Sequence, residues 1–66
     1  MKGRQFVKLL RHHGVEIIEK RGKGGHVLAV FRGRKTTIPV HGDADFDPVF
    51  LQKICKQLGI NPKDIL

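Results

Sequence analysis

Hydrophobic residues recur with helical spacing near the start of the chain and predict a helix from Gly3 or Arg4 to His13, ended by Gly14. Its apolar face follows a 3.6-residue period and consists of Phe6, Leu9, Leu10 and His13. The other side of this helix carries the cationic residues Arg4, Lys8 and Arg11. His12 and His13 lie in the last turn, where the helix dipole favours a protonated imidazole, so we interpret them as capping residues.

Three short runs with two-residue alternation follow, and they predict a three-stranded antiparallel meander. The strands are expected at Val15 to Lys20, His26 to Arg32 and Lys35 to Val40. Gly33 suits a tight turn between the second and third strands. Pro39 lacks the N–H that a central strand needs, which places the third strand at an edge of the sheet or Pro39 at its end.

The middle strand is apolar on both of its faces. One face reads His26, Leu28 and Val30, and the other reads Val27, Ala29 and Phe31. A strand covered by helices on one side only should carry polar residues on its other side. The pattern therefore predicts that the second face is also covered, with a partner chain as the candidate.

Local signals predict a second helix and its two ends. Asp47 followed by Pro48 is typical of a helix start, because aspartate caps the first N–H groups and proline fits the first helical position. The apolar stripe consists of Phe50, Leu51, Ile54 and Leu58. Gly59 and Ile60 fit a Schellman ending. Asn61-Pro62 repeats the start signal and predicts a last short turn from Lys63 to Leu66.

The predicted order is α-β-β-β-α, an α+β fold with both helices on one face of the sheet, as in double-stranded-RNA-binding domains. With 66 residues, the chain is expected to form one domain, residues 1–66. Asp43, Asp45 and Asp47 resemble the opening of a calcium loop, but the glycine and glutamate that complete such a loop are missing, so no metal site is predicted.

Charge favours a polyanionic partner, because thirteen Lys and Arg residues oppose six Asp and Glu residues and give a net charge of +7. Nucleic acid is the leading candidate. No apolar run approaches the roughly 18 residues of a membrane-spanning helix, and the start of the chain has no signal-peptide core, so no membrane association is expected. Cys55 is the single cysteine and cannot form an internal disulfide, which favours a cytoplasmic location, and its helical spacing predicts a core or half-core position.

A basic, glycine-rich turn at residues 20–26 delivers His26 to the start of the second strand. Its glycines let the backbone bend tightly and approach a ligand. Lys20, Arg21 and Lys23 surround the bend with positive charge. An imidazole beside several cations has the parts needed for chemistry on a phosphodiester. Such turns also occur on ordinary protein surfaces, where the histidine is only a structural polar residue.

This turn, the segment Thr37-Ile38-Pro39-Val40-His41 and residues 51–60 together resemble the HicA family of toxin mRNA interferases, over nearly the whole chain. The family's glycine-then-histidine motif, commonly G-S-H, falls on Gly24-Gly25-His26. Its P-x-H motif falls on Pro39-Val40-His41. Two departures stand out: Gly25 replaces a common serine, and the segment from Asp43 to Asp47 replaces a lysine-containing one, so fewer RNA contacts are expected there.

The resemblance implies the toxin of a type II toxin–antitoxin system, a metal-independent mRNA endoribonuclease without a cofactor. Its partners would be mRNA and a HicB-like antitoxin protein, with DNA bound only through the antitoxin complex. In such a reaction the neighbouring 2′-OH attacks the phosphate, which requires a base, a cation and an acid. Histidine suits the role of base because it changes charge between pH 5 and 8, and His26 matches the family's catalytic residue.

The remaining candidates bind RNA or complete the reaction. The predicted RNA-binding residues are Lys20, Arg21, Lys23, Gly24, Gly25, Arg32, Arg34 and Lys35. His41 is a possible secondary site residue, and the acid is left open between His41, a lysine and water. Two other functions remain: a non-catalytic RNA-binding module of the same fold, and a small DNA-binding or assembly protein. The last lacks a recognition-helix pattern, because the second helix carries only Lys53 and Lys56.

Overall fold

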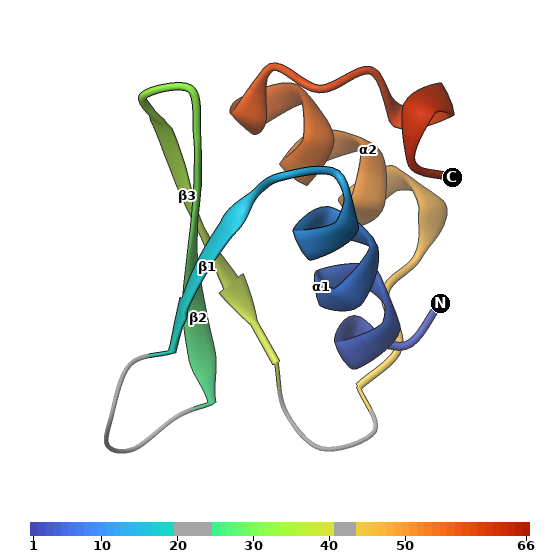
Figure 1. The fold of residues 1–66 in the computed structure, drawn as a ribbon. Helices are drawn as coiled ribbons and strands as arrows, with labels where there is room; N and C mark the ends of the chain where they lie inside the picture. Colours follow the sequence, from blue (N-terminus) through green and yellow to red (C-terminus); the bar gives the residue numbers. More distant parts are fainter. Residues whose placement is uncertain (20–24, 41–43) are drawn as a thin grey trace.

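The computed structural model describes residues 1–19, 25–40 and 44–66. Its elements are α1 (Gly3–His12), β1 (Glu16–Glu19), β2 (His26–Phe31), β3 (Arg34–Pro39), α2 (Pro48–Leu58) and the 3-10 helix η1 (Pro62–Asp64). The sheet forms one layer, and both helices lie on the same side of it (Figure 1). The predicted α-β-β-β-α order and α+β class are confirmed.

The sheet is antiparallel with the order β1-β2-β3, so β2 is the central strand. At one end of the sheet Glu19 pairs with Val27, and His26 pairs with Pro39. Phe31 pairs with Arg34 at the other end. β3 is an edge strand and Pro39 is its last residue, as expected for a residue that cannot donate a backbone hydrogen bond.

The buried side of α1 differs from the predicted one. Phe6 and Leu10 are fully buried, as expected, but Val7 joins them, whereas Leu9 is half-buried and His13 is exposed. Apolar residues occupy several adjacent directions around this helix, so spacing alone permits more than one stripe. Packing against the sheet and against residues 44–46 selects the stripe that contains Val7.

The hydrophobic core lies between the two layers. Its largest fully buried side chains come from both helices and from the edge strand: Phe6, Leu10, Ile38, Leu58 and Cys55. Each large side chain of this kind contributes about 1.5–3 kcal/mol through its burial. Cys55 is a core residue, as predicted, and burial raises the pKa of its thiol. A hydrogen bond from the Thr36 hydroxyl to the Gln57 side chain also joins β3 to α2.

Both predicted ends of α2 are confirmed. The Asp47 carboxylate accepts a hydrogen bond from the Phe50 N–H at 2.8 Å, and Pro48 is the first helical residue. At the other end Gly59 adopts a φ of 74°, and the Ile60 N–H donates to the Cys55 carbonyl at 2.8 Å.

The last turn lies slightly earlier than predicted. It covers Pro62–Asp64 rather than Lys63 to Leu66. Asn61 accepts a hydrogen bond from the Lys63 N–H at 3.0 Å, so the capped turn includes the proline as its first residue.

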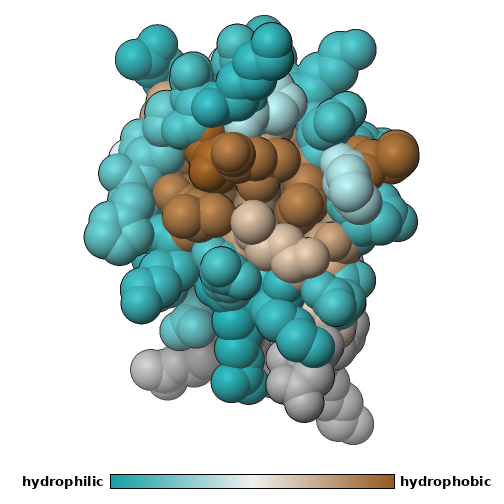
Figure 2. Space-filling view, turned by 90° about the vertical axis from the view of Figure 1, so that its right-hand side faces the viewer, coloured by the Kyte–Doolittle hydropathy of each residue, from teal (hydrophilic) through white to brown (hydrophobic). Residues whose placement is uncertain are grey.

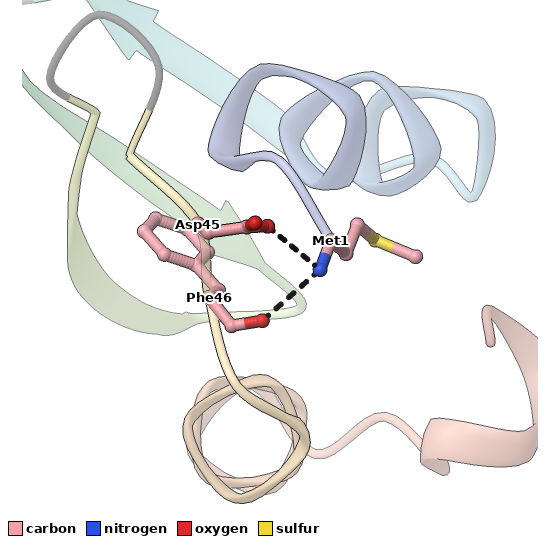
Figure 3. A network of polar contacts seen from close by, with 3 residues as sticks. All are labelled: Met1, Asp45 and Phe46. Atoms are coloured by element: carbon pink, nitrogen blue, oxygen red, sulfur yellow. Dashed lines mark hydrogen bonds and ion pairs between the residues drawn. The ribbon is translucent and has the colours of Figure 1, made fainter.

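The segment before α2 is anchored to the start of the chain (Figure 3). The α-amino group of Met1 donates to the Phe46 carbonyl at 3.2 Å and lies 3.0 Å from Oδ1 of Asp45. The hydrogen bond from this amine, and then its charge, lower the pKa of Asp45. The Phe46 ring packs edge-on against Phe6. Asp45 therefore holds the chain start, Asp47 caps α2, and Asp43 lies outside the described residues.

Hydrophobic side chains also gather at the surface on the side that carries both chain ends, within a border of hydrophilic residues (Figure 2). Met1 is 37% exposed and Leu66 is 47% exposed. Within the described part of the chain, neither helix has the length and apolar character needed to cross a membrane.

Candidate active site

A pocket of about 550 Å³ lies between α1 and the end of the sheet where β1 ends and β2 begins. We call it the α1–sheet pocket. Its helix wall consists of Arg4, Val7 and Arg11. Its sheet wall consists of Glu19, Gly25, His26, Val27 and Val40. A volume of this size lies within the range of small-ligand sites.

His26 is the first residue of β2 and is exposed at the border of this pocket. The ladder that holds it continues past Pro39, because the Val40 N–H donates to the Gly25 carbonyl at 2.6 Å. Gly25 adopts a φ of 56°, which an L-residue rarely adopts, so glycine suits this approach to the strand. The sheet therefore fixes the position of the His26 backbone on both sides of the residue.

The sheet face without helices continues from His26. Side chains alternate along a strand, so His26 shares this face with Leu28 and Val30. Ile18 pairs with Leu28 and is 42% exposed. Leu28 and Val30 are only half-buried, and both helices lie on the other side of the sheet (Figure 1). This open sheet face is therefore apolar directly beside His26.

Three predicted RNA-binding residues lie at the other end of the β2–β3 hairpin, and these are Arg32, Arg34 and Lys35. The strand rise of about 3.4 Å per residue separates the two ends of β2 by roughly 17 Å. The Arg32 guanidinium lies over the Phe31 ring, 5.2 Å from its centroid. The structure thus brings these cations together but not to His26.

Five further predicted residues lie outside the described residues: Lys20, Arg21, Lys23, Gly24 and His41. The segments that carry them are bounded by residues of the α1–sheet pocket. Residues 20–24 connect Glu19 to Gly25, and residue 41 follows Val40.

Sequence reasoning missed the arginines of the helix wall and the carboxylate opposite them. Arg4 and Arg11 were placed only on the side of the helix away from its predicted apolar face, and Glu19 was given no role. The available signal was the spacing, because residues seven apart on a helix lie on nearly the same side. Among the residues that the structure describes, no hydrogen bond or ion pair engages either guanidinium.

This arrangement places two guanidinium groups on one wall of a pocket whose other wall includes His26, an exposed residue. Guanidinium groups match the geometry of phosphate oxygens, and imidazole accepts and donates protons near neutral pH. The pocket therefore has the chemical groups to bind a phosphate and to transfer a proton beside it.

Fold and site together define a class: small basic α+β proteins in which a strand-borne histidine borders a cationic pocket. A family model described as the HicA toxin of bacterial toxin-antitoxin matches residues 3–60. The match covers most of the 66 residues, so the chain belongs to the HicA toxin family and is a toxin of a toxin–antitoxin system. The family implies an antitoxin partner. No curated protein and no solved structure matches the chain.

Proposed function

We propose that this toxin is an mRNA endoribonuclease that acts without a metal and uses His26 as its general base. The observation that carries the proposal is the position of His26, which is exposed at the start of the central strand and borders a pocket with two guanidinium groups. Membership of the HicA toxin family supports a toxic activity, and the net charge of +7 supports a polyanionic substrate.

The proposed reaction begins when the His26 imidazole takes the proton of a ribose 2′-OH. The 2′-oxygen attacks the adjacent phosphorus atom, and the bond from phosphorus to the 5′-oxygen of the next nucleotide breaks. That oxygen receives a proton from an acid and leaves as a hydroxyl. The products carry a 2′,3′-cyclic phosphate and a 5′-hydroxyl, so no oxidant, reductant or hydrolytic water is consumed in this step.

Cations stabilise the additional negative charge on the phosphate in the transition state. Lys20, Arg21 and Lys23 are proposed for this role, with the backbone of Gly24 and Gly25 close to the substrate. The acid is assigned to His41, a lysine or water.

We also propose a HicB-like antitoxin that covers the open sheet face. The exposed side chain of Ile18 and the half-buried side chains of Leu28 and Val30 support an apolar contact there. His26 lies on the same face, so a protein bound to it also blocks access to the imidazole. Acidic residues at the rim of that protein would complement the basic toxin.

The decisive experiment compares His26→Ala with His12→Ala, which removes an exposed histidine from α1. Purified proteins are incubated with a long single-stranded RNA, with and without EDTA, and the product ends are analysed. We expect His26→Ala to lose a factor of about 10²–10⁴ in cleavage rate, because that is the usual contribution of proton transfer. His12→Ala and the parent should cleave equally, and EDTA should have no effect.

Two further measurements separate the alternatives. If His26→Ala keeps its circular dichroism spectrum and most of its RNA affinity, the loss of cleavage belongs to the chemical step. A parent protein that binds RNA without cleaving it would instead support the non-catalytic RNA-binding module. Full cleavage by folded His26→Ala would eliminate the proposed base.

A further inference from the structure

We propose that Arg4 and Arg11 bind backbone phosphates of the RNA, so that the helix wall of the α1–sheet pocket is part of the substrate site. This inference rests on the proposed function, because it assigns the substrate contacts of the same pocket. It adds residues that lie outside the family's glycine-then-histidine and P-x-H motifs.

The spacing of the two arginines fits a polymer with regularly spaced charges. They are seven residues apart, which on an α-helix corresponds to a rise of about 10.5 Å and a rotation of only about 20°. Both side chains therefore leave α1 in nearly the same direction, and both line the pocket. Val7 lies between them, is 8% exposed and provides an apolar surface. Two charged phosphates separated by a less polar sugar match this order of cation, apolar side chain and cation.

Both guanidinium groups are available to a ligand. Arg4 and Arg11 are exposed, and no hydrogen bond or ion pair holds either one to another described residue. A guanidinium group forms two parallel hydrogen bonds with phosphate oxygens. A phosphate therefore gains these bonds without first displacing a carboxylate of residues 1–19, 25–40 or 44–66 from the arginine.

Glu19 lies on the opposite wall of the pocket, and its substitution should change RNA affinity in the opposite direction to substitution of the arginines. Glu19 lines the same pocket, and no ion pair within residues 1–19, 25–40 and 44–66 joins its carboxylate to either arginine. A phosphate bound along α1 is repelled by this negative charge. Removing the charge should therefore strengthen RNA binding, whereas removing an arginine should weaken it.

In this proposal the helix wall of the pocket binds phosphates and His26 of the sheet wall transfers the proton. Phosphates held along α1 place the RNA strand opposite Gly25 and His26, which line the sheet wall. Arg4 and Arg11 are then binding residues that orient the strand, and His26 remains the only proton acceptor in the proposal.

The test measures binding of a fluorescein-labelled, single-stranded 2′-O-methyl RNA, which lacks the attacking hydroxyl and stays intact. Fluorescence anisotropy gives the affinity at several KCl concentrations for the parent and for the double variant Arg4→Gln/Arg11→Gln. The matched control is Lys53→Gln/Lys56→Gln, which removes the same charge from exposed positions on α2.

Two lost phosphate contacts should reduce the slope of log affinity against log salt by about 1.4, since each contributes roughly 0.7 with single strands. If affinities converge at 1 M KCl, this slope change corresponds to about tenfold weaker binding at 150 mM. The control should keep nearly the parent slope, and Glu19→Gln should bind more tightly than the parent. Equal slopes and affinities for the arginine and lysine double variants would overturn the proposal.

Other outcomes are equally informative. Circular dichroism and thermal melting establish that each variant is folded; if the double variant is not, the single variants Arg4→Gln and Arg11→Gln should each lose about 0.7 in slope, and unchanged slopes overturn the proposal. A poly-glutamate peptide of the same charge serves as a probe for an acidic protein partner. An equal or larger loss of affinity for this peptide would assign the arginines to protein binding and overturn the RNA assignment.

The binding assay is independent of cleavage. If the arginine variant loses RNA affinity while the parent shows no cleavage, the phosphate contacts stand and the proposed enzymatic function fails. If cleavage depends on His26 while the arginine variant binds RNA like the control, the function stands and the phosphate contacts are refuted.

Discussion

Replacing Arg32 and Lys35 with glutamine is expected to weaken the binding of long RNA while leaving the rate of the chemical step unchanged. Both residues lie near the β2–β3 turn, where Phe31 pairs with Arg34 and Val30 pairs with Lys35. His26 pairs with Pro39 at the opposite end of the hairpin. A rise of about 3.4 Å per residue puts Lys35, which pairs with Val30, roughly 14 Å along the strand from His26 and Arg32 roughly 20 Å from it.

The electrostatic effect over this distance is small. Two unit charges about 17 Å apart in water interact by about 0.2 kcal/mol. A Debye length of about 8 Å at physiological salt reduces that energy roughly eightfold. Removing both cations therefore changes the activation free energy by about 0.1 kcal/mol or less, which is a rate change of about 1.2-fold. Long RNA that reaches the turn loses about 0.7 in salt slope for each contact removed.

The assay is single-turnover cleavage of a short fluorogenic RNA at saturating enzyme and 150 mM KCl, together with the affinity for a long 2′-O-methyl RNA. Arg32→Gln/Lys35→Gln is compared with the parent and with Lys53→Gln/Lys56→Gln. A fall in the single-turnover rate of threefold or more, specific to the hairpin variant, would refute the reasoning. It would mean that these cations act at the scissile phosphate in spite of their distance from His26.

Two predictions concern stability. Gly59→Ala should lower the melting temperature, since an L-residue at a φ of 74° costs about 1–2 kcal/mol, or several degrees in a domain of this size, and the new Cβ would lie 3.2 Å from Cδ of Arg34. Gly33→Ala is the control, because Gly33 has a φ of 82° and a Cβ added there would have no atom within 4 Å, so its loss of melting temperature reports the backbone strain alone. A smaller loss of melting temperature for Gly59→Ala than for Gly33→Ala would contradict an added clash with Arg34. Asp45→Asn should lower the melting temperature of the untagged protein at pH 7, because the Met1 amine holds the pKa of Asp45 below its ordinary value of 3.8. A carboxyl with a lowered pKa stabilises the fold above its unfolded-state pKa and loses that effect as the pH falls, so the difference from the parent should vanish well below pH 3.8, and a constant difference would refute the pairing.

Local chemistry made several elements readable from the sequence. Asp47-Pro48 and Gly59-Ile60 act on backbone groups within a few residues, so the start and end of α2 need no tertiary information. The position of His26 at the start of β2 followed in the same way from the glycines before it and the alternation after it. The family motifs also lie within short segments, which is why the HicA resemblance was visible before the fold.

Tertiary packing decided what local patterns left open. Apolar residues occur on adjacent sides of α1, and the choice of Val7 over Leu9 depends on contacts with segments far along the chain. Phe46 was given no role by spacing, yet its ring packs against Phe6, forty residues earlier in the sequence.

The sequence by itself determined the order of the elements and the residue most suited to catalysis, because capping, turn formation and alternation depend on neighbouring residues. Only the tertiary structure decided which charges surround that residue. His26 is the first residue of β2 and Arg32 directly follows its last residue, so the extended strand separates them. The packing of α1 on the sheet brings Arg4 and Arg11 to the pocket that His26 also lines. Strand register and helix docking join residues distant in sequence, so no local pattern along the chain specifies them.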